Sequence, residues 1–464
     1  MIRFIIFIVS IAALTLHAEE QLSISGSIID SAGNTVAHAR IEVANQAFET
    51  DKSGKFKASI KGTNAFYQIK ISKAGFYSSI HTLSQQELKT NGELATVTLV
   101  EKNADRVMLA FGGDVMMGRR FYKPYFGDAA LIENATQLAD MKDIVKHVKP
   151  YMEIADYAAV NLETQLAEQT PKEKAPKSVV FYTKPDILAA LEWAGIDYVS
   201  LGNNHTYDYL DSGLETTLSA LSKSNLGYSG AGINEAQALK AFEQQINEQP
   251  YSMLAYVGWE GSAKPNQTAG KAKGGAAFGS SKNIVETVNQ AVNKNRYTIV
   301  QYHGSQEYAD EPTGVTEQRL KTAIDQGASL AIAHHPHVAQ GIELYNNQLI
   351  AYSMGNFIFD QNFASTMHSF ILYVWLDRGQ FHHAEIVPIY VQGYKPTPAT
   401  DSQRVQVLNR LTTLSKYRNT HILPSGAHGI IKKVNDANTA STQVVLAKGK
   451  LTSKLPEAIA FNEI

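Results

Sequence analysis

From Arg106 onward, apolar segments of strand length alternate with amphipathic helical segments, and this alternation constrains the fold more than any other feature of the sequence. The predicted strands are 106–111, 157–162, 197–201, 253–259, 297–302 and 330–333. Between them, apolar residues recur at helical spacing, as at Met141, Ile144 and Val148. Strands that alternate with helices in this way predict an open, layered α/β sheet.

Chemically active side chains follow five of these strands, just beyond the last apolar residue of each. They are Asp114, Glu163, Asn204-His205, His303 and His335/His337. In open α/β sheets, ligands bind at the carboxyl ends of strands, so we expect these side chains to meet at one rim. One Asp after Gly-Gly is usually a turn residue, and one His is usually structural. Turns do not explain the recurrence at five strand ends, which predicts a divalent-metal site.

The composition limits which metals this rim can hold. The chain of 464 residues has 14 His and no Cys, so the ligands must be imidazole, amide and carboxylate groups. Such ligands suit Mn, Zn or Fe, and a carboxylate can bridge two ions. Two ions about 3.5–4 Å apart can stabilise both the attacking and the leaving oxygen of a phosphoryl displacement. One ion and two ions both remain open.

The composition also excludes several classes of function. Lys and Arg total 42 against 44 Asp and Glu, a formal net charge of −2, so no basic field indicates a nucleic-acid partner. The absence of Cys excludes a disulfide scaffold and a thiolate nucleophile.

Residues 1–18 have the order of features that is typical of a secretory signal peptide. Arg3 precedes the apolar run 4–16, and Ala18 is a small residue at the expected cleavage site. The run is shorter than the ~20 residues of a membrane span. The alternative is an uncleaved membrane anchor, because Leu16 is large for the third position before the cut. We expect cleavage after Ala18 and a periplasmic or extracellular protein.

Residues 22–100 alternate apolar and polar positions between turns. The turns at 30–34 (DSAGN) and 51–55 (DKSGK) separate short strands, which predicts a small antiparallel β-sandwich. The segment 24–56 resembles the carboxypeptidase-regulatory-like domain of secreted enzymes. No convergent titratable cluster is evident in it. We therefore expect a spacer or docking module, separable from the rest at the polar stretch 101–106.

Six ordered motifs within residues 104–395 resemble the CapA family of capsule-synthesis proteins, whose members include the PgsA-type poly-γ-glutamate proteins. The motifs are FGGDVMMGR (111–119), NLET (161–164), LGNNHTYDY (201–209), YHGSQEY (302–308), HHPHV (334–338) and YSMGNFIFDQ (352–361). That family is similar in its core to calcineurin-like metallophosphatases. The resemblance implies a layered, metallophosphatase-like α/β sandwich over 104–395. A C-terminal helix and tail are predicted at 396–464, and no function is predicted for them.

The resemblance also implies which residues bind metal. Those that match the metallophosphatase ligands are Asp114, Glu163, Asn204, His303, His335 and His337. Glu163 matches the bridging carboxylate. Met116 stands where the pattern has a histidine. A first site of Asp114, Glu163 and His337 therefore has fewer ligands than a second site of Glu163, Asn204, His303 and His335. This departure leaves either one firmly held and one labile ion, or a single ion.

The matching catalytic residue is His205, which would protonate the leaving oxygen while a metal-activated water attacks. Asp208 would orient that imidazole, the alternative being an ordinary turn residue. Three weaker candidates for substrate binding are Arg119, Glu307 and Asn356. Arg119 could bind a carboxylate or phosphate through two hydrogen bonds, but a surface arginine is an equal alternative.

The sequence thus predicts an extracytoplasmic protein that makes, exports or anchors a capsular polymer such as poly-γ-glutamate. The reaction would be metal-assisted hydrolysis or transfer at a phosphoryl or acyl centre. The expected partners are an anionic polymer, or a phosphorylated or γ-glutamyl substrate, and a membrane capsule-synthesis complex. The alternative is a binding or scaffold protein without chemistry. The thinned first site favours a scaffold, whereas the Asn204-His205 pair favours catalysis, since a scaffold has no use for a proton donor.

Overall fold

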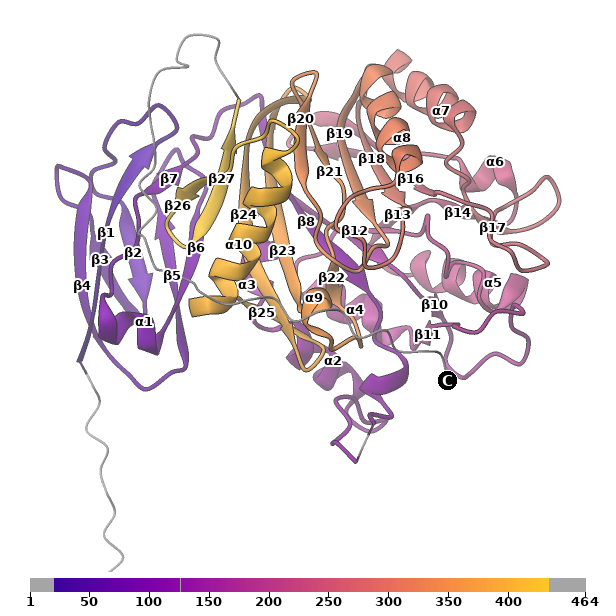
Figure 1. Ribbon diagram of the computed structural model, residues 1–464, viewed down its shortest axis with the longest axis horizontal. Coiled ribbons are helices and arrows are strands. Elements are labelled where there is room, and N and C mark those ends of the chain that lie inside the picture. The colour runs from indigo at the N-terminus through magenta and orange to yellow at the C-terminus, as the bar shows by residue number, and fades with distance from the viewer. Residues whose placement is uncertain (1–20, 126, 434–464) are drawn as a thin grey trace, which may run out of the picture. The chain divides into compact units, whose positions relative to one another are not determined.

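The computed structural model describes residues 21–125 and 127–433 (Figure 1). The predicted signal segment 1–18 lies outside the described residues, as does the end of the predicted tail. The described chain has an N-terminal β region followed by an α/β region, so the predicted α/β class is confirmed. None of the helices in the described ranges is long and apolar enough to cross a membrane.

The N-terminal β region consists of two sheets that share one apolar core. The sheet orders are β4-β1-β7 and β3-β2-β5-β6, and all pairs are antiparallel except β1 with β7. In β4, buried Phe56, Ala58 and Ile60 alternate with exposed residues, as expected for a strand with one wet face. The elements of this region are β1 (Gln21–Asp30), β2 (Arg40–Val43), β3 (Gln46–Glu49), β4 (Lys55–Lys61), β5 (Phe66–Ser72), β6 (Ser79–Ser84), α1 (Gln85–Thr90) and β7 (Val97–Leu99).

The larger sheet of the α/β region has the order β13-β12-β9-β8-β23-β24-β27-β26, with β22 beside β8 and β25 beside β24. Its central strand β8 is buried along its whole length because its two faces meet different cores. Val107, Leu109 and Phe111 face one core, and Met108 and Ala110 face the other. The strands are β8 (Arg106–Val115), β9 (Tyr157–Leu162), β12 (Tyr198–Ser200), β13 (Gly227–Ser229), β22 (Asn356–Ile358), β23 (His368–Asp377), β24 (Gln380–Gln392), β25 (Lys395–Pro398), β26 (Leu423–Ser425) and β27 (His428–Lys432).

A second sheet of six strands has the order β15-β16-β18-β19-β21-β20. It packs face to face with the larger sheet, because Ile299 and Ile332 share a core with Leu109 and Leu372. Its strands are β15 (Phe242–Ile246), β16 (Gln249–Val257), β18 (Tyr297–His303), β19 (Ala328–His334), β20 (Ile342–Tyr345) and β21 (Gln348–Ala351). Two small pairs are β10 (Gln165–Leu166) with β11 (Tyr182–Thr183), and β14 (Ala231–Gly232) with β17 (Gly275–Ala276).

Helices cover the outer faces of both sheets, which gives a helix–sheet–sheet–helix order (Figure 1). α2 (Gln137–Val145), α4 (Asp186–Trp193) and α5 (Leu210–Leu221) pack on the larger sheet. α7 (Ser281–Asn293) and α8 (Gly314–Asp325) pack on the second sheet. The remaining helices are η1 (Arg119–Phe121), α3 (Lys149–Glu153), α6 (Glu235–Ala238), α9 (Ala364–Met367) and α10 (Asp401–Lys416).

The five strands with polar ends do not belong to one sheet, which corrects the sequence-based expectation of a single rim. β8, β9 and β12 lie in the larger sheet, whereas β18 and β19 lie in the second. Apolar periodicity marks strands that are buried on both faces, but it carries no information about which sheet each strand joins. The carboxyl ends still converge, because the two sheets pack against each other there.

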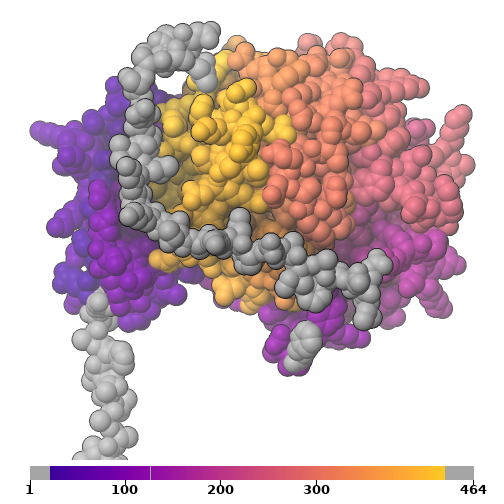
Figure 2. All heavy atoms as spheres, viewed as in Figure 1, coloured from indigo at the N-terminus to yellow at the C-terminus, as the bar shows by residue number. Residues whose placement is uncertain are grey.

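The larger sheet continues past residue 395, the predicted end of its domain. β27 pairs with β24, so the tail completes the sheet. The segment from α10 to β27 is yellow in Figure 2 and lies beside the indigo N-terminal β region. Arg404 pairs with Glu87 there, and the Thr98 amide donates to Ser425 Oγ at 2.9 Å. This segment therefore links the β region to the α/β region.

Gly113→Ala should destabilise the fold and displace the neighbouring Asp114. A Cβ at position 113 would lie 1.9 Å from the carbonyl oxygen of Gly355, which also accepts the Asp114 amide at 3.0 Å. Overpacking against backbone costs about 3 kcal/mol. Thermal unfolding followed by circular dichroism measures the loss. The control is Gly314→Ala, where a Cβ meets nothing within 4 Å. Equal melting temperatures for the two variants would contradict this prediction.

Candidate metal centre

Asp114 and Asn161 connect the two sheets at the centre of the convergence. Asp114 is completely buried near the end of β8, and its Oδ1 accepts a hydrogen bond from Asn161 Nδ2 at 2.8 Å. The same Nδ2 lies 3.1 Å from Nδ1 of His303, which ends β18 in the second sheet. Asn161 thus fixes a carboxylate of one sheet relative to an imidazole of the other.

Glu163 follows β9 and is the central carboxylate of the group. It is completely buried, and within the described ranges neither carboxylate oxygen has a hydrogen-bond partner. Its Oε1 lies 3.6 Å from Nε2 of both His205 and His303, and 4.0 Å from Nε2 of His337. Burial, followed by the charge of Asp114, raises the pKa of Glu163 well above its usual range. A buried carboxylate with unpaired oxygens among imidazoles fits a ligand of a cation.

The backbone at the end of β19 directs two histidine rings into the same space. His335 and His337 have left-handed φ angles of 101° and 59°. Pro336 lies between them in the sequence. Nδ1 of His335 lies 3.1 Å from Nε2 of His303, and Nδ1 of His337 lies 3.3 Å from Oδ2 of Asp114. Such conformations cost about 1–3 kcal/mol each and cluster at functional sites.

The ligand atoms gather in two groups that overlap at one residue. One group is Asp114, Glu163 and His337, and the other is Glu163, His303 and His335. Within each group, the ligand atoms all lie within 4.8 Å of one another. The first group has the members that the resemblance implies for the first site, and the second has three of the four implied for the second site, which also includes Asn204. Glu163 belongs to both groups. The structure therefore brings five of the six predicted ligands together in groups that could hold metal.

Asn204, the sixth predicted ligand, has a buried Oδ1 with no partner among the described residues. This oxygen is available to a cation. The neighbouring Asn203 shapes the loop, because its Nδ2 donates to the Leu162 carbonyl at 2.8 Å and its Oδ1 accepts the His205 amide at 3.0 Å. Met116 is completely buried in a small apolar cluster and supplies no ligand to the first group.

His205 is held so that its Nε2 faces the metal ligands. Nδ1 lies 2.7 Å from Oδ2 of Asp208, and the ring stacks on Phe181 at 3.9 Å. Lys177 forms an ion pair with Asp208 from the loop that precedes β11. Burial lowers the pKa of His205 to about 4, although Asp208 favours the charged form. At neutral pH the ring is therefore uncharged, with its proton on Nδ1 toward Asp208.

The three predicted substrate contacts lie in different surroundings. The guanidinium of Arg119 makes two hydrogen bonds to Asp360, at 2.6 and 3.0 Å, so a substrate anion would have to replace that carboxylate. Asn356 is completely buried and its Oδ1 lies 2.9 Å from Nδ1 of His337, one of the predicted ligands, and its contact with substrate stays a prediction. Glu307 is exposed. Substrate contact by Arg119 and Glu307 stays a prediction.

Several supporting residues carry little signal in the sequence. Oε1 of Gln301 lies 3.0 Å from Nε2 of His334, and Nδ1 of His334 lies 3.6 Å from Oδ1 of Asp114, so His334 links Gln301 to the first ligand group. The Trp259 ring lies 4.6 Å from the ring of His335. Asn161 belongs to the NLET motif, which is the one signal that could have indicated it. Gln301 and Trp259 act through contacts between different strands, which no local pattern indicates.

Comparisons with known proteins match the chain to bacterial capsule proteins. The family model described as "Bacterial capsule synthesis protein PGA_cap" matches residues 108–361, which include all six predicted ligands. The PGA biosynthesis protein CapA of Bacillus subtilis (strain 168) is 28% identical over 331 residues, 70% of this chain and 83% of that protein. The capsule biosynthesis protein CapA of Bacillus anthracis is 26% identical over 325 residues, 68% of this chain and 76% of that protein.

Among solved structures, a hypothetical protein from Thermus thermophilus aligns with 62% of this chain and 96% of its own, with a TM-score of 0.34 and 13% identity.

Glu163→Gln should raise the melting temperature of chelator-treated protein. Because burial raises the pKa of the Glu163 carboxyl, its ionisation above pH about 4.3 favours the unfolded chain, and the amide of Gln removes that cost. Differential scanning calorimetry in the presence of a chelator measures the gain. The matched control is Glu307→Gln, which removes an exposed carboxylate and should leave the melting temperature unchanged. A Glu163→Gln protein that melts at or below the wild-type temperature would refute the prediction.

Proposed function

Because this chain belongs to the bacterial capsule synthesis family PGA_cap, we propose that it acts outside the cytoplasm in making, exporting or anchoring a capsular polymer of the poly-γ-glutamate type. Membership confirms the CapA-family resemblance seen in the six motifs. The names of the two Bacillus relatives support a role in capsule or PGA biosynthesis. The apolar segment 4–16 supports export to the periplasm or the extracellular space.

The proposed activity is metal-dependent hydrolysis or transfer at a phosphoryl or acyl centre. The observation that carries it is the position of Glu163, an unpaired buried carboxylate shared by two ligand groups. The imidazole, carboxylate and amide donors fit one or two ions of Mn, Zn or Fe. The helix–sheet–sheet–helix order agrees with the metallophosphatase-like core that the motifs imply.

Each residue around His205 has a part in proton transfer. Divalent ions, when bound at such a centre, supply activation of water and stabilisation of charge on the reacting oxygens. Nε2 of His205 would take up the proton that the attacking water loses and give a proton to the leaving oxygen. Asp208 stabilises the imidazolium through Nδ1, and Phe181 keeps the ring in one orientation. Lys177 holds Asp208 in place on its other side.

A groove of about 600 Å³ next to this centre suits an anionic polymer such as a γ-glutamyl chain. Its lining includes the cations Arg119, Lys123 and Lys184, the carboxylate Glu133, and the tyrosines Tyr122, Tyr182 and Tyr209. The Arg119 guanidinium lies 4.5 Å from the Phe181 ring, which itself stacks on His205. The groove and the proton-transfer residue are therefore in contact through one aromatic ring.

The N-terminal β region is proposed as a carboxypeptidase-regulatory-like sandwich that docks the protein to a membrane capsule-synthesis complex. Its two sheets with one shared core support the sandwich assignment. The predicted domains 22–100, 104–395 and 396–464 belong to the same proposal, with the last joined to the larger sheet through β27.

A catalytically silent scaffold is the second candidate function. Met116 favours it, because the first ligand group then has three protein ligands and lacks a histidine of the metallophosphatase pattern. The buried His205–Asp208 pair favours catalysis, because a scaffold does not require a proton-transfer residue held in this way.

His335→Ala should remove the metal ion held by the group of Glu163, His303 and His335 from purified protein. The residue supplies one of three ligands in its group. His334 is not a member of that group, since its Nε2 lies 3.0 Å from Gln301 and its Nδ1 lies 3.6 Å from Asp114. Inductively coupled plasma mass spectrometry of gently purified protein measures the metal content. The control is His421→Asn at an exposed position. A wild-type protein that contains no Mn, Zn or Fe would refute the metal hypothesis.

His205→Asn should preserve metal content while lowering turnover about 10²–10⁴-fold, as expected for loss of a general acid. Phosphoester and γ-glutamyl substrates provide the activity assay, and polymer production in cells provides the biological readout. If the variant keeps wild-type metal content and polymer production, the scaffold function is favoured instead.

A further inference from the structure

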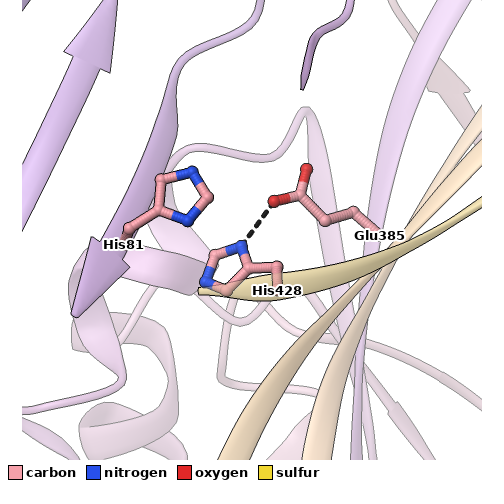
Figure 3. Close-up of side chains that lie close together, drawn as sticks. All are labelled: His81, Glu385 and His428. Atoms are coloured by element: carbon pink, nitrogen blue, oxygen red, sulfur yellow. Dashed lines mark hydrogen bonds and ion pairs between the residues drawn. The ribbon is translucent and has the colours of Figure 1, made fainter. Parts of the chain in front are cut away.

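A third group of metal-ligating side chains lies far from this centre in the sequence and joins the two regions of the chain. His81 is on β6, Glu385 on β24 and His428 on β27, with exposed fractions of 0%, 2% and 3%. One ligand atom from each lies within 4.8 Å of the others. Figure 3 shows the two rings side by side and the carboxylate directed at His428. We propose that these three residues bind a structural Zn²⁺ that fastens the N-terminal β region to the larger sheet.

The charge around Glu385 supports a cation at this position. Among the described residues, its one ion pair is with His428, at 2.5 Å between Oε1 and Nδ1. Arg404, the nearby cation, is occupied by Glu87 and by the carbonyl of Thr82. Glu385 is thus a buried carboxyl group beside two imidazole rings whose centroids lie 4.1 Å apart. Buried ionisable groups are normally paired or bind metal.

The donor set fits zinc. Two imidazoles and one carboxylate form a common zinc ligand set, with a fourth position for water or a hydroxyl. Ser79 Oγ is placed to serve there, since it lies 3.0 Å from Nε2 of His81 and 3.4 Å from Oε1 of Glu385. Binding would release the proton shared by His428 and Glu385 to solvent.

His81 is held in place by the hairpin that carries His428. The Ala427 amide donates to Nδ1 of His81 at 3.2 Å. A Cβ on Gly426 would lie 2.6 Å from that ring, and the φ of +58° at Gly426 also favours glycine. The glycine therefore lets the backbone of the turn lie close to the His81 ring. Zinc coordination through either nitrogen of His81 must replace the Ala427 contact or the Ser79 contact, and the ion's binding energy has to exceed that loss.

This inference revises the expectation that residues 22–100 hold no convergent titratable group. His81 lies more than 300 positions before Glu385 and His428 in the sequence, so no local spacing indicates the group. With zinc bound, the β region would be a fixed part of the molecule and not a separable spacer.

The first test uses the full-length chain without substitution. Crystals grown with zinc chloride, with diffraction collected on both sides of the zinc absorption edge, should give an anomalous peak between His81, Glu385 and His428. A map without a peak there, at a zinc concentration that occupies any other site, would overturn the proposal. This result is independent of the centre at Glu163, which contributes its own separate peaks.

The second test compares two buried histidines of the same sheet. His428→Gln should bind about one zinc equivalent less than wild type and lose the zinc-induced rise in melting temperature. His383→Gln, two residues before Glu385 and 1% exposed, should keep both. Equal zinc content and an equal thermal response in the two variants would overturn the proposal. If His428→Gln fails to fold, the anomalous map of the wild type decides.

Discussion

The carboxylate of Glu163 is the group on which the rest of the site depends. It lies where the carboxyl ends of strands from two packed sheets meet, and it is close to imidazoles from both. A buried carboxylate without hydrogen bonds is expensive, and the fold retains it only because the apolar core between the sheets supplies enough stability. The centre is therefore a place where stability is given up for ligand arrangement.

The backbone near the centre is also strained in a way that favours the arrangement of the ligands. His335 and His337 adopt left-handed conformations that a non-glycine residue rarely takes, and both are needed to bring two rings of one segment toward Glu163. Asn356 then fixes the His337 ring at Nδ1, so that Nε2 is the nitrogen left facing Glu163. Local strain and the hydrogen bonds behind the ligands thus act together to set which nitrogen each ring presents.

Sequence patterns predicted the strands and the polar side chains that gather at their ends, because both depend on local order. An apolar run followed by Asp114 or His303 indicates where a strand ends and which polar side chain follows it. The distribution of those strands over two sheets was not predictable, since pairing partners are set by packing between distant segments. Asn161 and Gln301 were missed as supports for the same reason: their partners come from other strands. The group around His81 shows this limit most clearly, because its three members come from regions that the sequence indicated were independent.

The C-terminal segment changes how the two regions are related. Its sequence pattern is weak and predicted a tail, yet β27 extends the larger sheet and its hairpin contacts the N-terminal β region. The larger sheet therefore includes β27, the last strand of the described chain, which lies between β24 and β26. Since β24 pairs with β23, and β23 with β8, the same run of hydrogen-bonded strands extends from His428 to Asp114. The β region and the centre at Glu163 are thus attached to one continuous sheet.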